Sequence, residues 1–320
     1  MTQSIKPLWR VWFVIVMLLA PLAGMTHAAQ GWRAFAEDSE NSKFIDVDGV
    51  RTHYIEMGSG SPVVFVHGLG AWSYSWRKNL EFAAGLGYRV IAVDLKGFGL
   101  SGKPEPVSKG DYTVADHAKF LKHFLEALWI EKADIVGNSM GGSAALYFAF
   151  TYPEATRRIV VVDPACYKQR FPLLLWSVKA PLLGRISEIF MGRTTAKMVL
   201  KQVYADSKKI TDDMVEAYAM PLSLTGGKRA FRMSTKRLLP EDYDRVISAY
   251  KQIKAPALVV WGEKDGWISP DMGRRLAKDL PNARLTIMKD CGHMPMEECP
   301  QGFNKLLAGF LKKAPKSKTP

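Results

Sequence analysis

The chain has 320 residues, of which 48% are hydrophobic and 23% are charged. That length suffices for one large domain with an inserted segment or for two small domains, and the composition argues against a disordered, collagen-like or polytopic membrane protein. The net charge of +13 favours anionic membrane surfaces or acidic partners, but no nucleic-acid motif accompanies it. We therefore expect no nucleic-acid partner, and a solvated basic surface is the simplest interpretation.

The first 28 residues differ from the rest of the chain. Lys6 and Arg10 precede a charge-free apolar run over 11–24, and the small residue Ala28 follows. A basic start, an apolar run of about 7–15 residues and a small-residue exit are typical of a secretory signal peptide. An uncleaved N-terminal anchor is the alternative, although the run is shorter than the roughly 20 residues that a spanning helix needs. We expect an exported protein, periplasmic or secreted.

Short apolar runs alternate with helical patterns over most of the remaining chain. Residues 44–56 alternate around Asp48-Gly49, which predicts a β-hairpin. Buried strands are predicted at 62–66, 89–94, 133–137, 158–163, 257–262 and 284–288. Helices are predicted over 113–128, with Thr113 as N-cap, and over 143–150. This alternation predicts an α/β fold with a parallel sheet.

The alternation stops between about 166 and 245. This stretch is rich in Leu, Met, Lys and Arg, with prolines as breaks, and parts of it are amphipathic. We interpret 166–245 as a helical cap inserted into a core formed by 29–165 and 246–311. A pair of ordinary crossover helices is the alternative, but the length argues against it. Residues 312–320 form a polar basic tail that we expect to be flexible.

The strongest chemical signal is the sequence Gly137-Asn138-Ser139-Met140-Gly141. It fits G-x-S-x-G and lies between a predicted strand and a predicted helix. Such a turn strains the backbone at the serine and projects its hydroxyl, and the small flanking residues let strand and helix approach each other. We therefore predict Ser139 as a nucleophile.

A serine nucleophile needs a base, and the base needs a carboxylate to orient it. Among six histidines, His293 lies in a loop after the last predicted strand, at the sheet edge where functional loops gather. Asp265 follows the strand 257–262 and is the predicted acid, while Asp163 and Glu263 are rival acids. The order Ser, Asp, His is the order found in α/β-hydrolases.

The tetrahedral intermediate of acyl transfer carries an oxyanion, which needs preorganised backbone donors. The N–H of Met140 is one predicted donor. The other is the N–H of Leu69, in the glycine-rich loop that follows strand 62–66.

Three cysteines, Cys166, Cys291 and Cys299, are too few for a disulfide scaffold. Cys291 and Cys299 could form a bridge, but we expect buried thiols. The chain has no CxxC pair and no histidine-rich tract, so we expect no metal and no cofactor.

These segments, in this order, resemble the α/β-hydrolase superfamily: VVFVHGLGAWSYSW, DLKGFGLSGKP, IVGNSMGG, VVWGEKD and CGHMPMEECP. More narrowly they resemble its capped serine esterase, lipase and C–C hydrolase branch. The resemblance covers about 45–310 and implies an eight-stranded, mostly parallel sheet with helices on both faces. It also implies a structural role for Asp94. Haloalkane dehalogenases and epoxide hydrolases use an aspartate where Ser139 stands and are set aside.

The leading sequence-based hypothesis is a carboxylic-ester hydrolase, an esterase or lipase, that forms an acyl-enzyme on Ser139 and takes a small hydrophobic ester. The alternative is a C–C bond hydrolase of meta-cleavage dienone products, with Arg185 or Arg193 binding a substrate carboxylate. Export favours the ester, since aromatic catabolism is intracellular. Perhydrolase activity and a non-catalytic binding protein are further alternatives. The basic surface and the N-terminus would favour association with a membrane surface.

Overall fold

The protein is described by a computed structural model that covers residues 31–32, 35, 40–168, 178 and 188–312. The predicted N-terminal segment, the tail from residue 313 and most of 169–187 lie outside these residues. Within them, no helix combines the length and apolar character that crossing a membrane requires.

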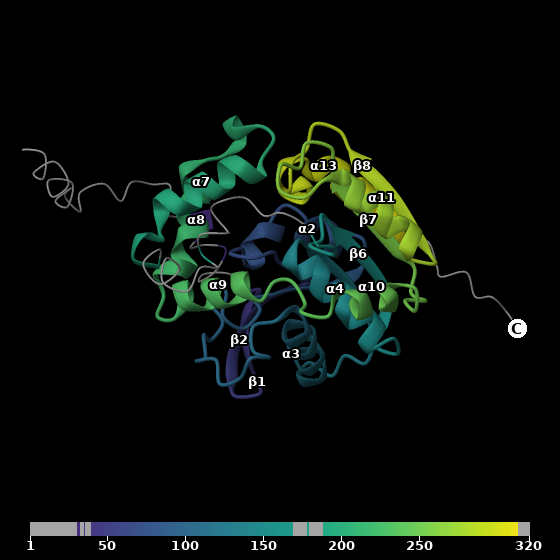
Figure 1. Ribbon diagram of the computed structural model, residues 1–320, viewed down its shortest axis with the longest axis horizontal. Helices are drawn as coiled ribbons and strands as arrows, with labels where there is room; N and C mark the ends of the chain where they lie inside the picture. Colours follow the sequence, from purple (N-terminus) through teal and green to yellow (C-terminus); the bar gives the residue numbers. More distant parts are fainter. Residues whose placement is uncertain (1–30, 33–34, 36–39, 169–177, 179–187, 313–320) are drawn as a thin grey trace, which may run out of the picture.

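The core is one eight-stranded sheet (Figure 1). Its strands are β1 (Ser42–Val47), β2 (Val50–Met57), β3 (Ser61–Val66), β4 (Tyr88–Val93), β5 (Ala133–Asn138), β6 (Thr156–Val162), β7 (Ala257–Gly262) and β8 (Ala283–Met288). Their order is β1-β2-β4-β3-β5-β6-β7-β8. Only the pairs β1–β2 and β2–β4 are antiparallel. The predicted eight-stranded, mostly parallel sheet is confirmed.

Helices cover both faces of this sheet. The core helices are α2 (Leu80–Ala84), α3 (Val114–Ala127), α4 (Met140–Thr151), α10 (Tyr243–Tyr250), α11 (Pro270–Asp279), α12 (Pro295–Glu298) and α13 (Pro300–Leu311), with a 3-10 helix η2 (Ser73–Trp76). Alternate residues of β3 serve the two faces: Val64 and Val66 pack in the layer of α3 and α4, whereas Val63 and Phe65 pack in the layer of α2 and α13. Both faces are therefore apolar, which explains the continuous apolar runs.

Local signals in the sequence fixed two element ends. Asp48 and Gly49 both have positive φ, 53° and 76°, as the two-residue hairpin turn requires. The Thr113 hydroxyl accepts a hydrogen bond from the Asp116 N–H at 3.1 Å, so the predicted N-cap of α3 is confirmed.

Between β6 and β7 the described chain is helical. It forms α7 (Arg193–Val203), a short 3-10 turn η3 (Ser207–Lys209), α8 (Asp212–Ser223) and α9 (Gly227–Lys236) before reaching α10. In Figure 1 the helices α7, α8 and α9 stand together beside the sheet. Helix α10 instead contacts α4. The expected boundary between 245 and 246 falls inside α10. Helices α7, α8 and α9 are called the cap below.

Candidate functional site

Ser139 lies in the tight turn between β5 and α4. Its backbone is strained, with φ 51° and ψ −115°, and its N–H donates to the Val162 carbonyl at 2.9 Å. The turn fits only because glycines flank it. A Cβ on Gly137 would lie 2.2 Å from the Gly141 carbonyl oxygen, and a Cβ on Gly141 would lie 2.2 Å from the Val66 oxygen. The side-chain requirements predicted for the G-x-S-x-G turn are therefore real steric limits.

His293 lies in the loop between β8 and α12, and its ring is held by Asp265. The distance from His293 Nδ1 to Asp265 Oδ2 is 2.8 Å. The other oxygen of Asp265 accepts the N–H groups of Trp267 and Ile268 at 2.8 and 3.0 Å, so this carboxylate is fixed on both sides. His293 Nε2 is buried and has no hydrogen-bond partner among the described residues. That nitrogen is available to a group in the cavity that Ser139 also lines.

The two rival acids occupy different environments. Glu263 is exposed, and its carboxylate accepts only the Asp290 N–H in the described chain, at 3.3 Å. Asp163 is fully buried, and one ligand atom each of Asp163, Asp265 and His293 lie within 4.8 Å of one another. Burial, together with the negative charge of Asp265, raises the pKa of Asp163 well above its usual value. These three side chains are also the cluster that could hold a metal, but Asp265 Oδ2 is already bonded to His293.

The predicted oxyanion donors flank Ser139. Met140 is the first residue of α4, where a helix leaves its N–H groups without an intrahelical partner. The loop of Leu69 also comes close, because a Cβ on Gly68 would lie 2.9 Å from Asn138 Oδ1 and 3.2 Å from Ser139 Cβ. Leu69 lines the cavity beside Ser139.

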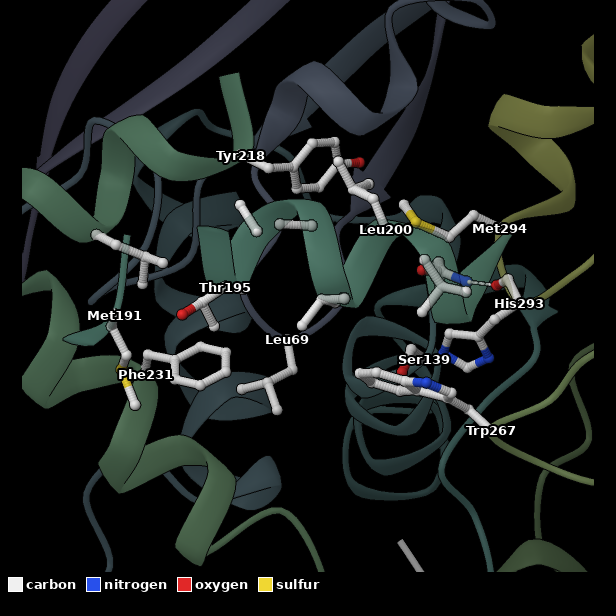
Figure 2. A pocket seen from close by; sticks show the side chains of 18 residues that line it. Leu69, Ser139, Met191, Thr195, Leu200, Tyr218, Phe231, Trp267, His293 and Met294 are labelled. Atoms are coloured by element: carbon white, nitrogen blue, oxygen red, sulfur yellow. Dashed lines mark hydrogen bonds between the residues drawn. The ribbon is translucent and has the colours of Figure 1, made fainter. Parts of the chain in front are cut away.

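A cavity of about 710 Å³, counting its open mouth, leads from the cap to Ser139. Figure 2 shows Ser139, His293 and Trp267 at one end, and Met191 and Phe231 at the other. Helices α7, α8 and α9 supply much of its wall, and most of the lining side chains are apolar. The cavity therefore suits a substrate whose variable part is apolar.

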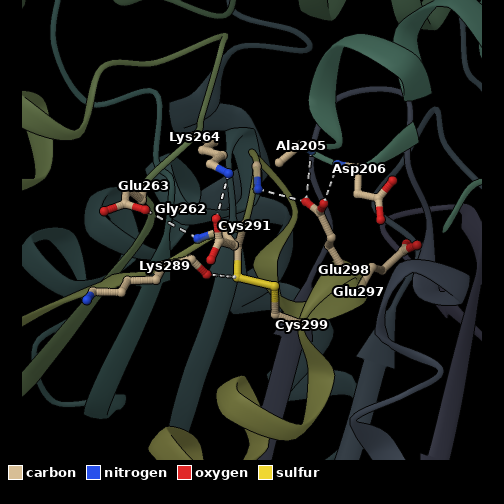
Figure 3. The surroundings of a disulfide bond; sticks show 12 residues. Ala205, Asp206, Gly262, Glu263, Lys264, Lys289, Cys291, Glu297, Glu298 and Cys299 are labelled. Atoms are coloured by element: carbon tan, nitrogen blue, oxygen red, sulfur yellow. Dashed lines mark hydrogen bonds and ion pairs between the residues drawn. A yellow bond between two sulfur atoms is a disulfide. The ribbon is translucent and has the colours of Figure 1, made fainter. Parts of the chain in front are cut away.

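The loop that carries His293 is closed by a disulfide between Cys291 and Cys299 (Figure 3). The expectation of two buried thiols is wrong, whereas Cys166 is a buried free thiol as expected. The short helix α12 turns the chain back, which leaves the two Cα atoms 6.3 Å apart, within the range that a bridge spans. The spacing of eight residues between the two cysteines does not by itself predict that the chain turns back here.

Glu298 ties the same loop to the cap. Its carboxylate accepts the N–H groups of Gly292 at 2.7 Å, Ala205 at 3.1 Å and Asp206 at 2.7 Å. The His293 N–H itself donates to the Val203 carbonyl, at the end of α7, at 2.7 Å. The position of the histidine thus depends on the cap as well as on the sheet.

A second buried acid, Glu297, joins three partners. Tyr204 donates to it at 2.5 Å, Arg77 lies 3.1 Å away, and Tyr218 also donates to it. Burial and the charge of Glu297 raise the pKa of Tyr218 well above its usual value, so its phenol stays a donor. The sequence signal for these contacts is the pair of adjacent glutamates that follows His293, which the predicted set of site residues does not include.

Other polar residues singled out by the sequence are structural. Asp94 is buried and binds His53 Nδ1 at 2.7 Å and the Ser73 N–H at 2.7 Å, which agrees with its expected structural role.

The aromatic residues Trp72 and Trp76, in the segment after the loop of Leu69, are fully buried, and neither lines the described cavity.

Comparison with known proteins shows the family to which the chain belongs. The family model described as the alpha/beta hydrolase fold matches residues 61–300. A 2-hydroxy-6-oxo-6-phenylhexa-2,4-dienoate hydrolase of Burkholderia cepacia is 31% identical over 286 residues, covering 86% of this chain and 97% of that protein. A 2-hydroxy-6-oxononadienedioate/2-hydroxy-6-oxononatrienedioate hydrolase of Paraburkholderia phymatum is 32% identical over 295 residues, covering 86% and 96%.

Comparison with solved structures identifies a similar protein with a related name. The meta-cleavage product hydrolase CumD of Pseudomonas fluorescens IP01 superposes with a TM-score of 0.71 at 27% identity, covering 84% of this chain and 97% of that one. The leading expectation of an esterase or lipase is therefore corrected, because these relatives, matched over nearly their whole length, are named as hydrolases of 2-hydroxy-6-oxo dienoates or of a meta-cleavage product, which is the alternative predicted from the sequence. The G-x-S-x-G turn could not make this distinction, since both chemistries use it.

Proposed function

We propose that this chain, which belongs to the alpha/beta-hydrolase fold family, hydrolyses the carbon–carbon bond beside the ketone of meta-cleavage dienone products. One observation carries the proposal: the strained Ser139 and the Asp265-bound His293 line the same, mostly apolar cavity. The names of the relatives supply the reaction class.

In the proposed reaction His293 Nε2 takes the proton of Ser139, and the serine oxygen attacks the C6 carbonyl carbon. The N–H groups of Leu69 and Met140 bind the oxyanion. When the tetrahedral intermediate collapses, the C5–C6 bond breaks and its electron pair passes to C5. In the 2-oxo tautomer of the substrate, formed when the 2-hydroxyl proton moves to C5, that pair is conjugated through C3=C4 with the C2 carbonyl. His293 then returns the proton of Ser139 to the resulting dienolate. Water then releases the acyl group as a carboxylic acid.

The cavity wall favours an apolar group on the ketone. None of the described residues that line the cavity is Lys, Arg, Asp or Glu. Arg193, one of the two suggested carboxylate ligands, is paired at the surface with Asp212 and Glu216 and does not line the cavity, and Arg185 lies outside the described residues. A phenyl group at C6 thus fits this wall better than a chain that ends in a second carboxylate.

Turnover of two dienones tests the proposal. We expect 2-hydroxy-6-oxo-6-phenylhexa-2,4-dienoate to be cleaved with a kcat/KM at least about tenfold above that for 2-hydroxy-6-oxononadienedioate, since burying an unpaired carboxylate costs well over 1.4 kcal/mol. Ser139→Ala should abolish cleavage without unfolding the protein. A protein whose Ser139 reacts with a fluorophosphonate probe but which cleaves neither dienone would contradict the assignment.

Export is a second proposal, supported by the N-terminal sequence and the disulfide, which persists mainly in oxidising compartments. Together with the first proposal it requires that the dienone reach the protein outside the cytoplasm, in contrast to intracellular aromatic catabolism. Fractionation of cells that express the full chain tests it. We expect the protein outside the cytoplasmic fraction, in the periplasm or medium if the segment is cleaved and with the membranes if it is retained. A cytoplasmic protein with reduced Cys291 and Cys299 would contradict it.

A further inference from the structure

The ends of two neighbouring strands bring a second carboxyl group to the site. β6 and β7 pair in parallel, with Val162 opposite Val260, so Asp163 follows β6 where Asp265 approaches from β7. Asp163 has a positive φ of 47° and its N–H donates to the Val260 carbonyl at 3.0 Å. Its Oδ1 accepts the Gly262 N–H at 2.9 Å. Backbone bonds on both sides therefore fix this side chain.

The other oxygen of Asp163 is the unusual atom. Oδ2 is buried and no N–H or O–H group of the described residues reaches it. It belongs to a carboxyl group whose atoms come within 4.8 Å of ligand atoms of both Asp265 and His293. Two ionised carboxylates this close in a buried site repel each other strongly, so one of them holds a proton. Burial and the charge of Asp265 raise the pKa of Asp163, which makes Asp163 the protonated member.

We propose that Asp163 is a positioning residue that donates a hydrogen bond to Asp265 and replaces it as the partner of His293 when Asp265 is lost. The proposal rests on the proposed function in one respect, that His293 acts as a base. Asp265 can accept this bond, since each carboxylate oxygen has two lone pairs. Without Asp265 the repulsion disappears, and Asp163 can ionise and hold the imidazolium.

A double-mutant cycle on Asp163→Asn and Asp265→Ala tests this. Asn tolerates the positive φ and keeps both an acceptor for Gly262 and a donor for Asp265. The readout is the rate at which a fluorophosphonate probe labels Ser139, which does not depend on the dienone. We expect Asp163→Asn to slow labelling by no more than about fivefold alone, but by at least about 50-fold in the Asp265→Ala background, because there Asp163 is the carboxylate that has replaced Asp265 beside His293.

Asp134→Asn is the matched control, because Asp134 is also a buried aspartate but pairs with Arg158, away from the site. It should slow labelling equally in both backgrounds, with thermal melts run on every variant. Equal slowing by Asp163→Asn in both backgrounds would overturn the proposal.

Infrared spectroscopy supplies a test that needs no activity. We expect the wild-type protein at neutral pH to show the C=O band of a protonated carboxyl group, and Asp163→Asn to lack it. Absence of that band from the wild-type protein would overturn the proposal whatever the labelling rates. A wild-type protein that shows the band but is never labelled would instead contradict the proposed function.

Discussion

The serine turn, residues 137–142, and the histidine loop, residues 289–299, supply the two reacting side chains of the proposed site in different ways. Close main-chain contacts, within the turn and with β3 and its loop, hold the serine turn, where added Cβ atoms at Gly137 and Gly141 would collide with main-chain atoms. Long-range side-chain contacts, a disulfide and a bond to α7 hold the histidine loop. The position of Ser139 therefore depends on close main-chain packing around the glycines of its turn, whereas the position of His293 depends on contacts with the cap.

The largest expected effect tests the sterics of the serine turn. Gly141→Ala would place a Cβ 2.2 Å from the Val66 oxygen and 2.5 Å from the His67 oxygen, both main-chain atoms. We expect a loss of more than about 4 kcal/mol in the free energy of unfolding, or no folded protein. Gly309→Ala in α13 is the control, because nothing lies within 4 Å of its added Cβ. A stable, active Gly141→Ala protein would show that the turn can relax.

The next effect tests the support of the histidine loop. Glu298→Gln replaces an accepting oxygen by an NH₂ group facing backbone N–H donors, which should cost about 1–3 kcal/mol. We expect labelling of Ser139 to slow at least about tenfold, because a misplaced base loses catalytic geometry. Glu131→Gln, at an exposed carboxylate before β5, is the control and should leave both unfolding and labelling unchanged. Unchanged labelling in Glu298→Gln would mean that the position of His293 does not depend on the contacts of Glu298.

Removing the disulfide tests the same loop by another route. The double replacement Cys291→Ser and Cys299→Ser opens a short loop, which should lower the free energy of unfolding by about 2–3 kcal/mol. A reducing agent should reproduce that loss in the wild-type protein and do nothing to the double variant. The bridge lies in the histidine loop and not in the serine turn, so we expect the double variant to stay folded. A double variant that does not fold would contradict the view that the two regions are held separately.

A smaller effect concerns the residue that joins the two regions. Asn138 belongs to the serine turn, yet its amide donates to the His293 carbonyl at 3.1 Å and to the Val162 carbonyl at 3.2 Å. Asn138→Ala should cost about 1–2 kcal/mol in denaturant unfolding, the worth of two modest hydrogen bonds. In a double variant with Glu298→Gln the two losses should not add, because both act on the histidine loop. Strict additivity would show that the two regions are independent.

The smallest effect expected near neutral pH is the pH dependence of stability that comes from a buried histidine, and it sets the pH range in which the other variants should be compared. Burial lowers the pKa of His117, on α3, to about 3 from 6.5. Between these two values the unfolded chain binds the proton and the folded one does not, so stability is present above pH 6.5 and falls as the pH drops. The slope should approach roughly 1.4 kcal/mol per pH unit, and His117→Leu should remove it. Equal acid sensitivity in both proteins would contradict the assignment.

The regular part of the fold could be predicted because its signals are local. Each apolar run became a strand, Thr113 capped α3 and Asp48-Gly49 formed the hairpin turn. Ser139 was predicted as the nucleophile in the same way, since a steric requirement at the flanking glycines leaves a five-residue sequence pattern. The family chemistry was not predictable from that pattern, because ester and C–C cleavage use the same turn and differ in what the cavity binds.

The sequence by itself predicted the strands, their order along the chain, two core helices and the candidate side chains Ser139, Asp265 and His293, since each of these side chains stands beside a strand end that local periodicity marks. Only the tertiary structure decided what surrounds them. It joined Cys291 to Cys299, set Glu298 against the end of α7 and placed Asp163 beside Asp265. These contacts link residues distant in sequence or separated by a turn, and their energies depend on burial and distance, which no run of neighbouring letters records.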